Sequence, residues 1–234
     1  MQQFFIEDIK NPILNKNQLH QVKHVLRMRS GDKVRLVDDL GQGIIAAFSD
    51  DTLMSFEKIE DINFPRKSNK VKIIMSLIRN ERLEWLIQKC AEVGVDEIVL
   101  YKADHGVVRD YKQKEARKLE RFNQIALEAS EQSYRQFPLK VLKVIDKNEL
   151  EHEKLDLNFY ADLNVKEHIT DVIEKDKTIT AIIGPEGGFS NSERERFKSL
   201  GFKPVSLGNQ VLRAETAPIV LGAFVSLLDK ELDV

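Results

Sequence analysis

The residues best suited to chemistry lie in the segment AIIGPEGGFSNSE, residues 181–193, where an apolar run ends in a glycine-rich loop. Such loops between a strand and a helix commonly hold phosphate, but they do so with a lysine or with the spacing G-x-G-x-x-G. This loop has neither, and it carries the carboxylate of Glu186. Its backbone could read an uncharged ring edge, and Glu186 favours a cationic ligand over an anionic one. A tight turn without any ligand is an equally good interpretation of the spacing.

A second loop, within SLGNQVLRAETAP at residues 206–218, places Arg213 and Glu215 among apolar neighbours. A charged pair of this kind is often a solvated ion pair without further role. Both loops, however, contain glycine, follow a predicted strand and precede a predicted helix. Because ligands of open α/β sheets gather where strands end, the two loops are expected to form two walls of one pocket.

Residues 16–35 form a basic segment in a chain of nearly neutral charge, with Asp32 as the single acidic residue. A patch of this kind suits an RNA backbone, although a solvated helix face is the alternative. His20 and His24 have a helical spacing that can bind zinc, but no third ligand is visible and the neighbours are cationic. The sequence therefore predicts no metal site. The cations of the segment are Lys16, Lys23, Arg27, Arg29, Lys33 and Arg35.

The elements before residue 60 predict a small, strand-rich module. A helix over 15–29 is expected to bury a stripe of Leu19, Val22, Val25 and Leu26. Strands are expected at 33–38, 43–49 and 52–59, and the polar segment 60–70 is expected to be a linker. The division into domains is predicted at 1–68 and 69–234.

Beyond the linker, strands alternate with helices, which predicts a mostly parallel sheet covered on both faces. Cys90 lies on an apolar helix face and is expected to be packed, and Gly94 is placed to end that helix. The last helix, from about Thr216, is apolar nearly all round and is expected to be central or to pack on another subunit. Strands are predicted at 71–78, 96–101, 139–145, 156–162, 178–184 and 203–208, and the longer helices at 81–94, 114–133, 191–201 and from 216.

Composition narrows the class of protein. The chain has 234 residues, 42% of them hydrophobic, and a net charge of −2, so it has no global signature of a nucleic-acid binder. Cys90 is the single cysteine, which excludes an internal disulfide. The N-terminal segment MQQFFIEDIKNP does not resemble a signal peptide, and no apolar run approaches the roughly 20 residues of a membrane span. We expect a cytoplasmic protein without a membrane partner.

The segments IIGPEGGFSNSE and LGNQVLRAETA together closely resemble the family of small-subunit (16S) ribosomal RNA uridine-N3 methyltransferases, which belongs to the trefoil-knotted methyltransferase superfamily. The segment HVLRMRSGDKVRLVD resembles the family's N-terminal RNA-binding module, and WLIQKCAEVGV and IALEASEQSYR resemble its helices. The resemblance implies an α/β fold with a trefoil-knotted, parallel-sheet domain preceded by a small PUA-like β-barrel. It also implies S-adenosylmethionine as cofactor, a homodimer, and small-subunit ribosomal RNA as partner, either free or in the assembled 30S subunit.

The resemblance assigns a role to each site residue. Arg213 is expected to stabilise negative charge on the uracil, and Glu215 to orient Arg213 or to serve as base. Glu186 is expected to have a binding or structural role. The cofactor-binding residues implied are Ile183, Gly184, Glu186, Gly187, Gly188, Leu207, Gly208, Val211 and Leu212. The RNA-binding residues come from charge and position instead: Lys23, Arg27 and Arg29 belong to the basic segment, Arg79 and Arg82 lie around the end of the predicted strand 71–78, and Arg135 follows the long helix. A solvated surface charge is the alternative for each of Arg79, Arg82 and Arg135.

The chain departs from the family pattern at three positions. Gln3 stands where members often have arginine, and Asn209 and Gln210 stand where they often have Pro-Arg, which puts RNA phosphate contacts at these points in doubt. Two other functions stay open at this stage. One is a ribose 2′-O-methyltransferase of the same superfamily, and the other is a non-catalytic RNA-binding protein.

Overall fold

The structure is a computed structural model, and it describes residues 1–228. The chain divides into two compact units, which are described separately. Unit 1 consists of residues 1–65 and 130–138, and unit 2 consists of 66–129 and the described chain from 139 onward. The boundary expected at 68/69 thus lies near the observed one, but a linear division could not foresee that 130–138 belongs with unit 1.

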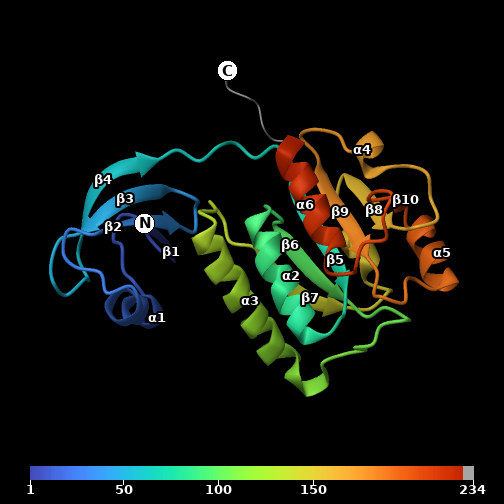
Figure 1. Cartoon of the computed structure of the whole chain (residues 1–234), viewed down its shortest axis with the longest axis horizontal. Coiled ribbons are helices and arrows are strands. Elements are labelled where there is room, and N and C mark those ends of the chain that lie inside the picture. The colour runs from blue at the N-terminus through green and yellow to red at the C-terminus, as the bar shows by residue number, and fades with distance from the viewer. Residues whose placement is uncertain (229–234) are drawn as a thin grey trace. The chain divides into compact units, whose positions relative to one another are not determined.

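Unit 1 is built on a four-stranded sheet with the order β1-β2-β3-β4 (Figure 1). Strand β1 runs parallel to β2, and the other pairs are antiparallel, with a bulge between Ile45 and Ala46. Strand β1 escaped prediction because its burial does not alternate along QQFFI. The strand expected at 52–59 begins later, because residues 50–55 form a turn closed by a Ser49 N to Ser55 O hydrogen bond of 3.0 Å. The strands are β1 (Gln2–Ile6), β2 (Lys33–Asp38), β3 (Gly43–Phe48) and β4 (Phe56–Ile62).

The helix expected over 15–29 is shorter and changes its winding. Helix α1 (Lys16–His20) continues as a π-helical turn, η1 (Gln21–Val25), in which the Leu26 amide donates to the Gln21 carbonyl at 2.8 Å. The wider turn breaks the 3.6-residue period on which the predicted apolar stripe rested. Val22 is fully buried, but Val25 is 66% exposed and Leu26 is 40% exposed, so the stripe was wrong at these two residues.

Gln3 has a structural role within unit 1. Its side chain is fully buried, its Nε2 donates to the Arg135 carbonyl at 2.7 Å, and its Oε1 accepts from Arg35 Nε at 3.2 Å. The carboxylate of Glu131 similarly accepts from the Phe5 amide at 3.2 Å. Gln3 therefore joins β1 to the segment 130–138. The buried place of Gln3 gives a structural reason for the doubt about an RNA phosphate contact at this position.

Unit 2 contains a six-stranded sheet in the order β10-β8-β9-β5-β6-β7 (Figure 1). Every neighbouring pair is parallel, as the alternation of strands and helices predicted. Strands β9 and β5, at the centre, are buried along most of their length, as expected for strands covered on both faces. The strands are β5 (Lys70–Ser76), β6 (Glu97–Tyr101), β7 (Lys140–Ile145), β8 (Leu157–Ala161), β9 (Thr178–Ile183) and β10 (Lys203–Val205).

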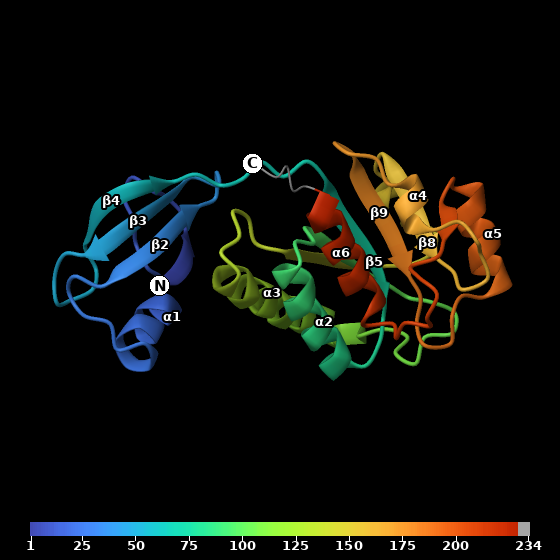
Figure 2. The same ribbon diagram turned by 45° about the horizontal axis from the view of Figure 1, so that its top comes forward.

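Helices cover both faces of this sheet. Figures 1 and 2 show α2 (Asn80–Glu92), α3 (Glu115–Gln132) and α6 (Ala217–Leu228) on one face, where they enclose a core that includes Ile73. Ile74, the next residue, points to the opposite core with Phe197 of α5 (Asn191–Ser199). Cys90 is fully buried, and Gly94, with φ of +91°, follows the end of α2, so both expectations are confirmed.

Short helical turns complete unit 2. They are η2 (Lys112–Lys114), η3 (Leu150–Glu153) and α4 (Ile169–Val172). No helix within residues 1–228 combines the length and the apolar character needed to cross a membrane.

Candidate active site

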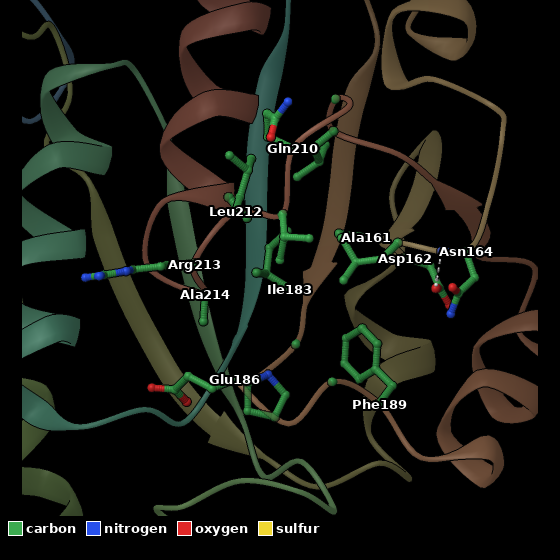
Figure 3. A pocket seen from close by; sticks show the side chains of 18 of the residues that line it. Ala161, Asp162, Asn164, Ile183, Glu186, Phe189, Gln210, Leu212, Arg213 and Ala214 are labelled. Carbon is green, nitrogen blue, oxygen red and sulfur yellow. Dashed lines mark hydrogen bonds between the residues drawn. The ribbon is translucent and has the colours of Figure 1, made fainter.

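A cavity of about 360 Å³ lies where strands β8, β9 and β10 end. Its walls come from the segments that follow those strands, together with the start of α6 (Figure 3). Because the strands are parallel, their carboxyl ends meet at one edge of the sheet, where ligands of open α/β folds bind. The two loops singled out in the sequence are therefore brought together as two walls of one cavity, as expected.

The backbone of the first loop is shaped by glycine. Gly188 has φ of +67°, and its amide donates to the Pro185 carbonyl at 2.9 Å, which closes a tight turn. In the second loop Gly208 has φ of +134°, a conformation that side chains rarely allow, and its amide donates to the Ser206 hydroxyl at 3.3 Å. A Cβ placed on Gly188 or Gly208 would have no heavy atom within 4 Å. Both glycines thus turn an uncovered backbone face to open space at the cavity.

A buried carboxylate fixes the end of the glycine loop. Glu193 is fully buried and closes the capping box with Ser190, as the sequence predicted. Its Oε2 accepts from the Ser190 amide at 2.7 Å, and its Oε1 accepts from the Tyr101 hydroxyl at 2.8 Å and from the Asp104 amide at 3.0 Å. Burial and the bond to Glu193 raise the pKa of Tyr101, so the phenol stays a donor. The loop is thereby tied to the end of β6.

Replacing Tyr101 by phenylalanine is expected to lower the free energy of unfolding by about 1.5–3 kcal/mol, because it removes one of the two donors to a buried carboxylate oxygen. Tyr111→Phe is the matched control. The Tyr111 hydroxyl is also buried, with the pKa raised to about 12 by burial, but it has no hydrogen-bond partner among the described residues. Its removal should be neutral or slightly stabilising in urea denaturation. Equal losses in the two variants would contradict the anchoring role of Glu193.

The third wall follows β8. Asp162 accepts from Arg194 Nε at 2.7 Å, and Arg194 Nη1 also donates to the Phe189 carbonyl. Asp162 and Arg194 form an ion pair in which the carboxylate is nearly covered. The guanidinium thus links the segment after β8 to the glycine loop. These polar groups satisfy one another, which leaves apolar surface of Phe189, Leu207 and Leu212 facing the cavity.

Arg213 is an exposed cation at the rim of the cavity. Its side chain makes no hydrogen bond or ion pair with any residue from 1 to 228, so it is available to a ligand. Figure 3 shows Arg213 and Glu186 extending to one side, while Asp162, Asn164 and Phe189 lie on the other. A fixed guanidinium in this position can stabilise negative charge on a molecule entering from that side.

Glu215 lies behind the rim and does not line the cavity. It is 7% exposed, its Oε1 is 3.8 Å from Arg82 Nε, and its Oε2 is buried without a partner among the described residues. Arg82 Nη1 also donates to Glu186 at 2.8 Å. Arg82 therefore stands between the two loops and contacts a carboxylate of each. The cation beside Glu215 is Arg82, so the expected pairing of Glu215 with Arg213 is not present.

The structure places most of the expected cofactor residues at the cavity. Gly187 is outside the lining, because its carbonyl faces His105, whose Nδ1 lies 3.3 Å away. That the lining residues contact a cofactor stays a prediction. The residues that line the cavity are Ile183, Gly184, Glu186, Gly188, Leu207, Gly208, Val211 and Leu212.

The expected RNA-binding residues fall into the two units. Arg79 precedes α2 with an exposed side chain in unit 2, where Arg82 has the carboxylate partners described above. Arg135 belongs to unit 1, and its Nε donates to the Phe137 carbonyl at 3.0 Å. The other three are exposed residues of unit 1, namely Lys23, Arg27 and Arg29.

Sequence reasoning missed the wall after β8 and the Arg194 link. Strand β8 precedes β9 along the chain and pairs with it, which is the usual arrangement of consecutive strands, but residues 161–164 contain no glycine-rich motif that would have drawn attention to them. Their polar character directly after a predicted strand was the available signal. The further lining residues are Ala161, Asp162, Leu163, Asn164, Pro185, Phe189, Arg194, Gln210, Ala214 and Ala217.

These features define an α/β protein whose parallel sheet carries a small-molecule cavity at its carboxyl edge, with a free arginine at the rim. Residues 65–226 match the family described as RNA methyltransferase domain, and the chain belongs to this family. It is similar to ribosomal RNA small subunit methyltransferase E of Bacillus subtilis, with 30% identity over 94% of this chain and 93% of the relative. The namesake protein of Rickettsia conorii is 29% identical over 95% of this chain and 91% of the relative.

A solved structure supports the same relationship. The crystal structure of a ribosomal RNA small subunit methyltransferase E from Neisseria gonorrhoeae, bound to S-adenosyl methionine, superposes with a TM-score of 0.87. The two chains are 25% identical, and the match covers 97% of this chain and 98% of the other.

Proposed function

We propose that this protein transfers a methyl group from S-adenosylmethionine to N3 of a uridine in small-subunit ribosomal RNA. The observation that carries the proposal is the cavity at the ends of β8, β9 and β10, with its two uncovered glycine faces and its free arginine. The names of the relatives supply the substrate, and the family resemblance supplies the acceptor atom. The partner is ribosomal RNA, either free or in the assembled 30S subunit.

The cavity suits the cofactor on three counts. Its walls present apolar side chains such as Leu207 and Leu212, which can enclose an adenine ring. Gly188 and Gly208 leave backbone groups open to a closely approaching ligand. The carboxylate of Glu186, which also lines the cavity, tolerates a sulfonium and would repel phosphate. When bound, the cofactor supplies an electrophilic methyl group.

The residues of the chain then act on the base. N3 of neutral uracil carries a proton and is a poor nucleophile, so the site must favour the anion whose charge spreads to the ring carbonyls. Arg213 lines the cavity and has no side-chain partner among the described residues, and it is assigned this role. Glu215 is assigned a positioning role through Arg82, since its carboxylate is buried behind the rim.

Further features of the family are part of the proposal. The trefoil knot is carried over from the family resemblance, and it would involve the segment from β10 at the sheet edge to α6, which packs on β5 at the centre. Unit 1 corresponds to the PUA-like domain. The apolar side chains of Trp85, Val220 and Leu227 are exposed on α2 and α6, which pack together, and they support a homodimer. If analytical ultracentrifugation at micromolar concentration detected monomers and no dimers, the result would contradict the proposed homodimer.

Binding and product mapping test the function. In calorimetry the protein is expected to bind S-adenosylmethionine or S-adenosylhomocysteine and not ATP, because the cavity has no phosphate cradle. Incubation with labelled S-adenosylmethionine and small-subunit RNA or 30S particles is expected to yield 3-methyluridine. A 2′-O-methylated product would show that the acceptor is the ribose 2′-oxygen and not N3. Binding of ATP without binding of any S-adenosyl ligand would overturn the proposal.

A further inference from the structure

An exposed five-residue segment of unit 1 mixes cations with apolar side chains. Residues 23–27, with the sequence KHVLR, are all exposed, and we name them the exposed turn. Val25 is 66% exposed and Leu26 is 40% exposed, between Lys23 and Arg27. A solvated helix face would present polar residues here, so the apolar side chains need another explanation.

The local fold forces these side chains outward. The π-helical turn η1 ends at Val25 and is capped by Leu26, and the next residue, Arg27, has φ of +52°, a conformation uncommon for residues other than glycine. The turn is held from both sides, because Val22 is fully buried and the Met28 amide donates to the Val22 carbonyl at 2.9 Å. Such strained turns persist where the surrounding structure holds them, and they concentrate at functional sites.

The chemistry of the exposed turn suits RNA with unpaired bases. Lys23, Arg27 and Arg29 can contact phosphates. The rings of His20 and His24 lie beside them with centroids 4.7 Å apart, and within residues 1–228 no group of three or more metal-ligating side chains could hold an ion there. Imidazole faces and aliphatic side chains pack on the faces of bases, which are accessible only when a nucleotide is unstacked.

We infer that the exposed turn, with His20 and Arg29, binds unpaired nucleotides of the RNA substrate, with Val25 and Leu26 packed against base faces. The inference rests on the proposed action on RNA. In a fully paired A-form duplex the base faces are stacked and the major groove is too narrow for side chains, so only the cations would find partners. The exposed turn therefore selects a loop or bulge over a duplex.

The test compares two RNA probes by fluorescence anisotropy with the full-length protein. One probe is a hairpin with an unpaired loop, and the other is a fully paired duplex with the same number of nucleotides. Val25→Ser/Leu26→Ser is expected to weaken hairpin binding about tenfold, through loss of apolar burial, while the salt slope and duplex binding stay unchanged. Arg29→Ala is expected to weaken both probes and to lower the salt slope by about one.

A matched control separates position from composition. Leu40 and Met54 are also exposed apolar residues of unit 1, 76% and 60% exposed, and Leu40→Ser/Met54→Ser is expected to leave hairpin binding unchanged. The inference would be overturned if the Val25→Ser/Leu26→Ser variant bound the hairpin as tightly as the parent protein does. It would also be overturned if the variant lost as much affinity for the duplex as for the hairpin. Either result would leave the proposed function untouched. The inference would also be overturned if the Val25→Ser/Leu26→Ser variant lost binding to anionic phospholipid vesicles but kept its binding to RNA. If the parent protein bound S-adenosylhomocysteine but neither the hairpin nor the duplex, the result would contradict both the inference and the proposed function.

Discussion

Replacing Arg213 by alanine is expected to lower the single-turnover rate of RNA methylation by about 100- to 1,000-fold, while affinity for S-adenosylmethionine changes far less. Arg213 is exposed at the cavity and has no partner among the described residues, so its charge is not used to hold the fold. Removal of one donor that stabilises a developing anion costs about 3 to 4 kcal/mol of transition-state stabilisation. The measurement is a single-turnover assay at saturating cofactor, with calorimetry on the same variant.

The pH dependence distinguishes this role from a structural one. If Arg213 stabilises the uracil anion, the rate of the variant should recover in part as pH rises, because more uracil is then already deprotonated. Arg213→Lys should retain part of the activity, since it keeps the charge but loses the planar fork. Arg117→Ala, an exposed arginine of α3, serves as the control and should be neutral. A rate restored at every pH by saturating cofactor would show instead that Arg213 supports the loop.

Elements with strong periodicity could be predicted from the sequence. The parallel sheet, α2 with Cys90 packed and Gly94 beyond its end, and the capping box of Ser190 with Glu193 all follow from local pattern. Where the structure differs, a non-local cause is present. The π-helical turn breaks the period at Val25, and β1 pairs with β2 through contacts that a window of residues cannot reveal.

The candidate site was predictable in its two loops but not in its electrostatics. The glycines and the apolar residues of both loops line one cavity, because each loop follows a parallel strand. The sequence did not reveal which charged residues meet, since Arg82 on α2, Glu186 after β9 and Glu215 before α6 are distant in sequence and come together only in the fold. The same holds for Gln3, whose partners at Arg35 and Arg135 place it inside unit 1.

Substituting alanine for Gly188 is expected to weaken binding of S-adenosylmethionine strongly. The face of Gly188 borders the cavity, and a Cβ there would meet no protein atom, so the new methyl group would occupy ligand space. Overpacking of a closely fitted site by one such group costs about 1–3 kcal/mol, which corresponds to a loss of roughly 5- to 150-fold in affinity. Gly188→Val should exceed this range, because a β-branched side chain also resists the positive φ.

Gly201→Ala provides the control for backbone strain. Gly201 has φ of +84° after α5, a Cβ there would have only Lys154 Nζ at 3.9 Å, and the residue does not line the cavity. Both alanine variants should therefore lose similar stability in thermal unfolding without ligand. Only Gly188→Ala should lose cofactor affinity in calorimetry, and only this variant should gain less thermal stabilisation from S-adenosylhomocysteine. Parent-like affinity in Gly188→Ala would show that the cofactor does not approach this face, and equal losses in both variants would attribute the effect to strain.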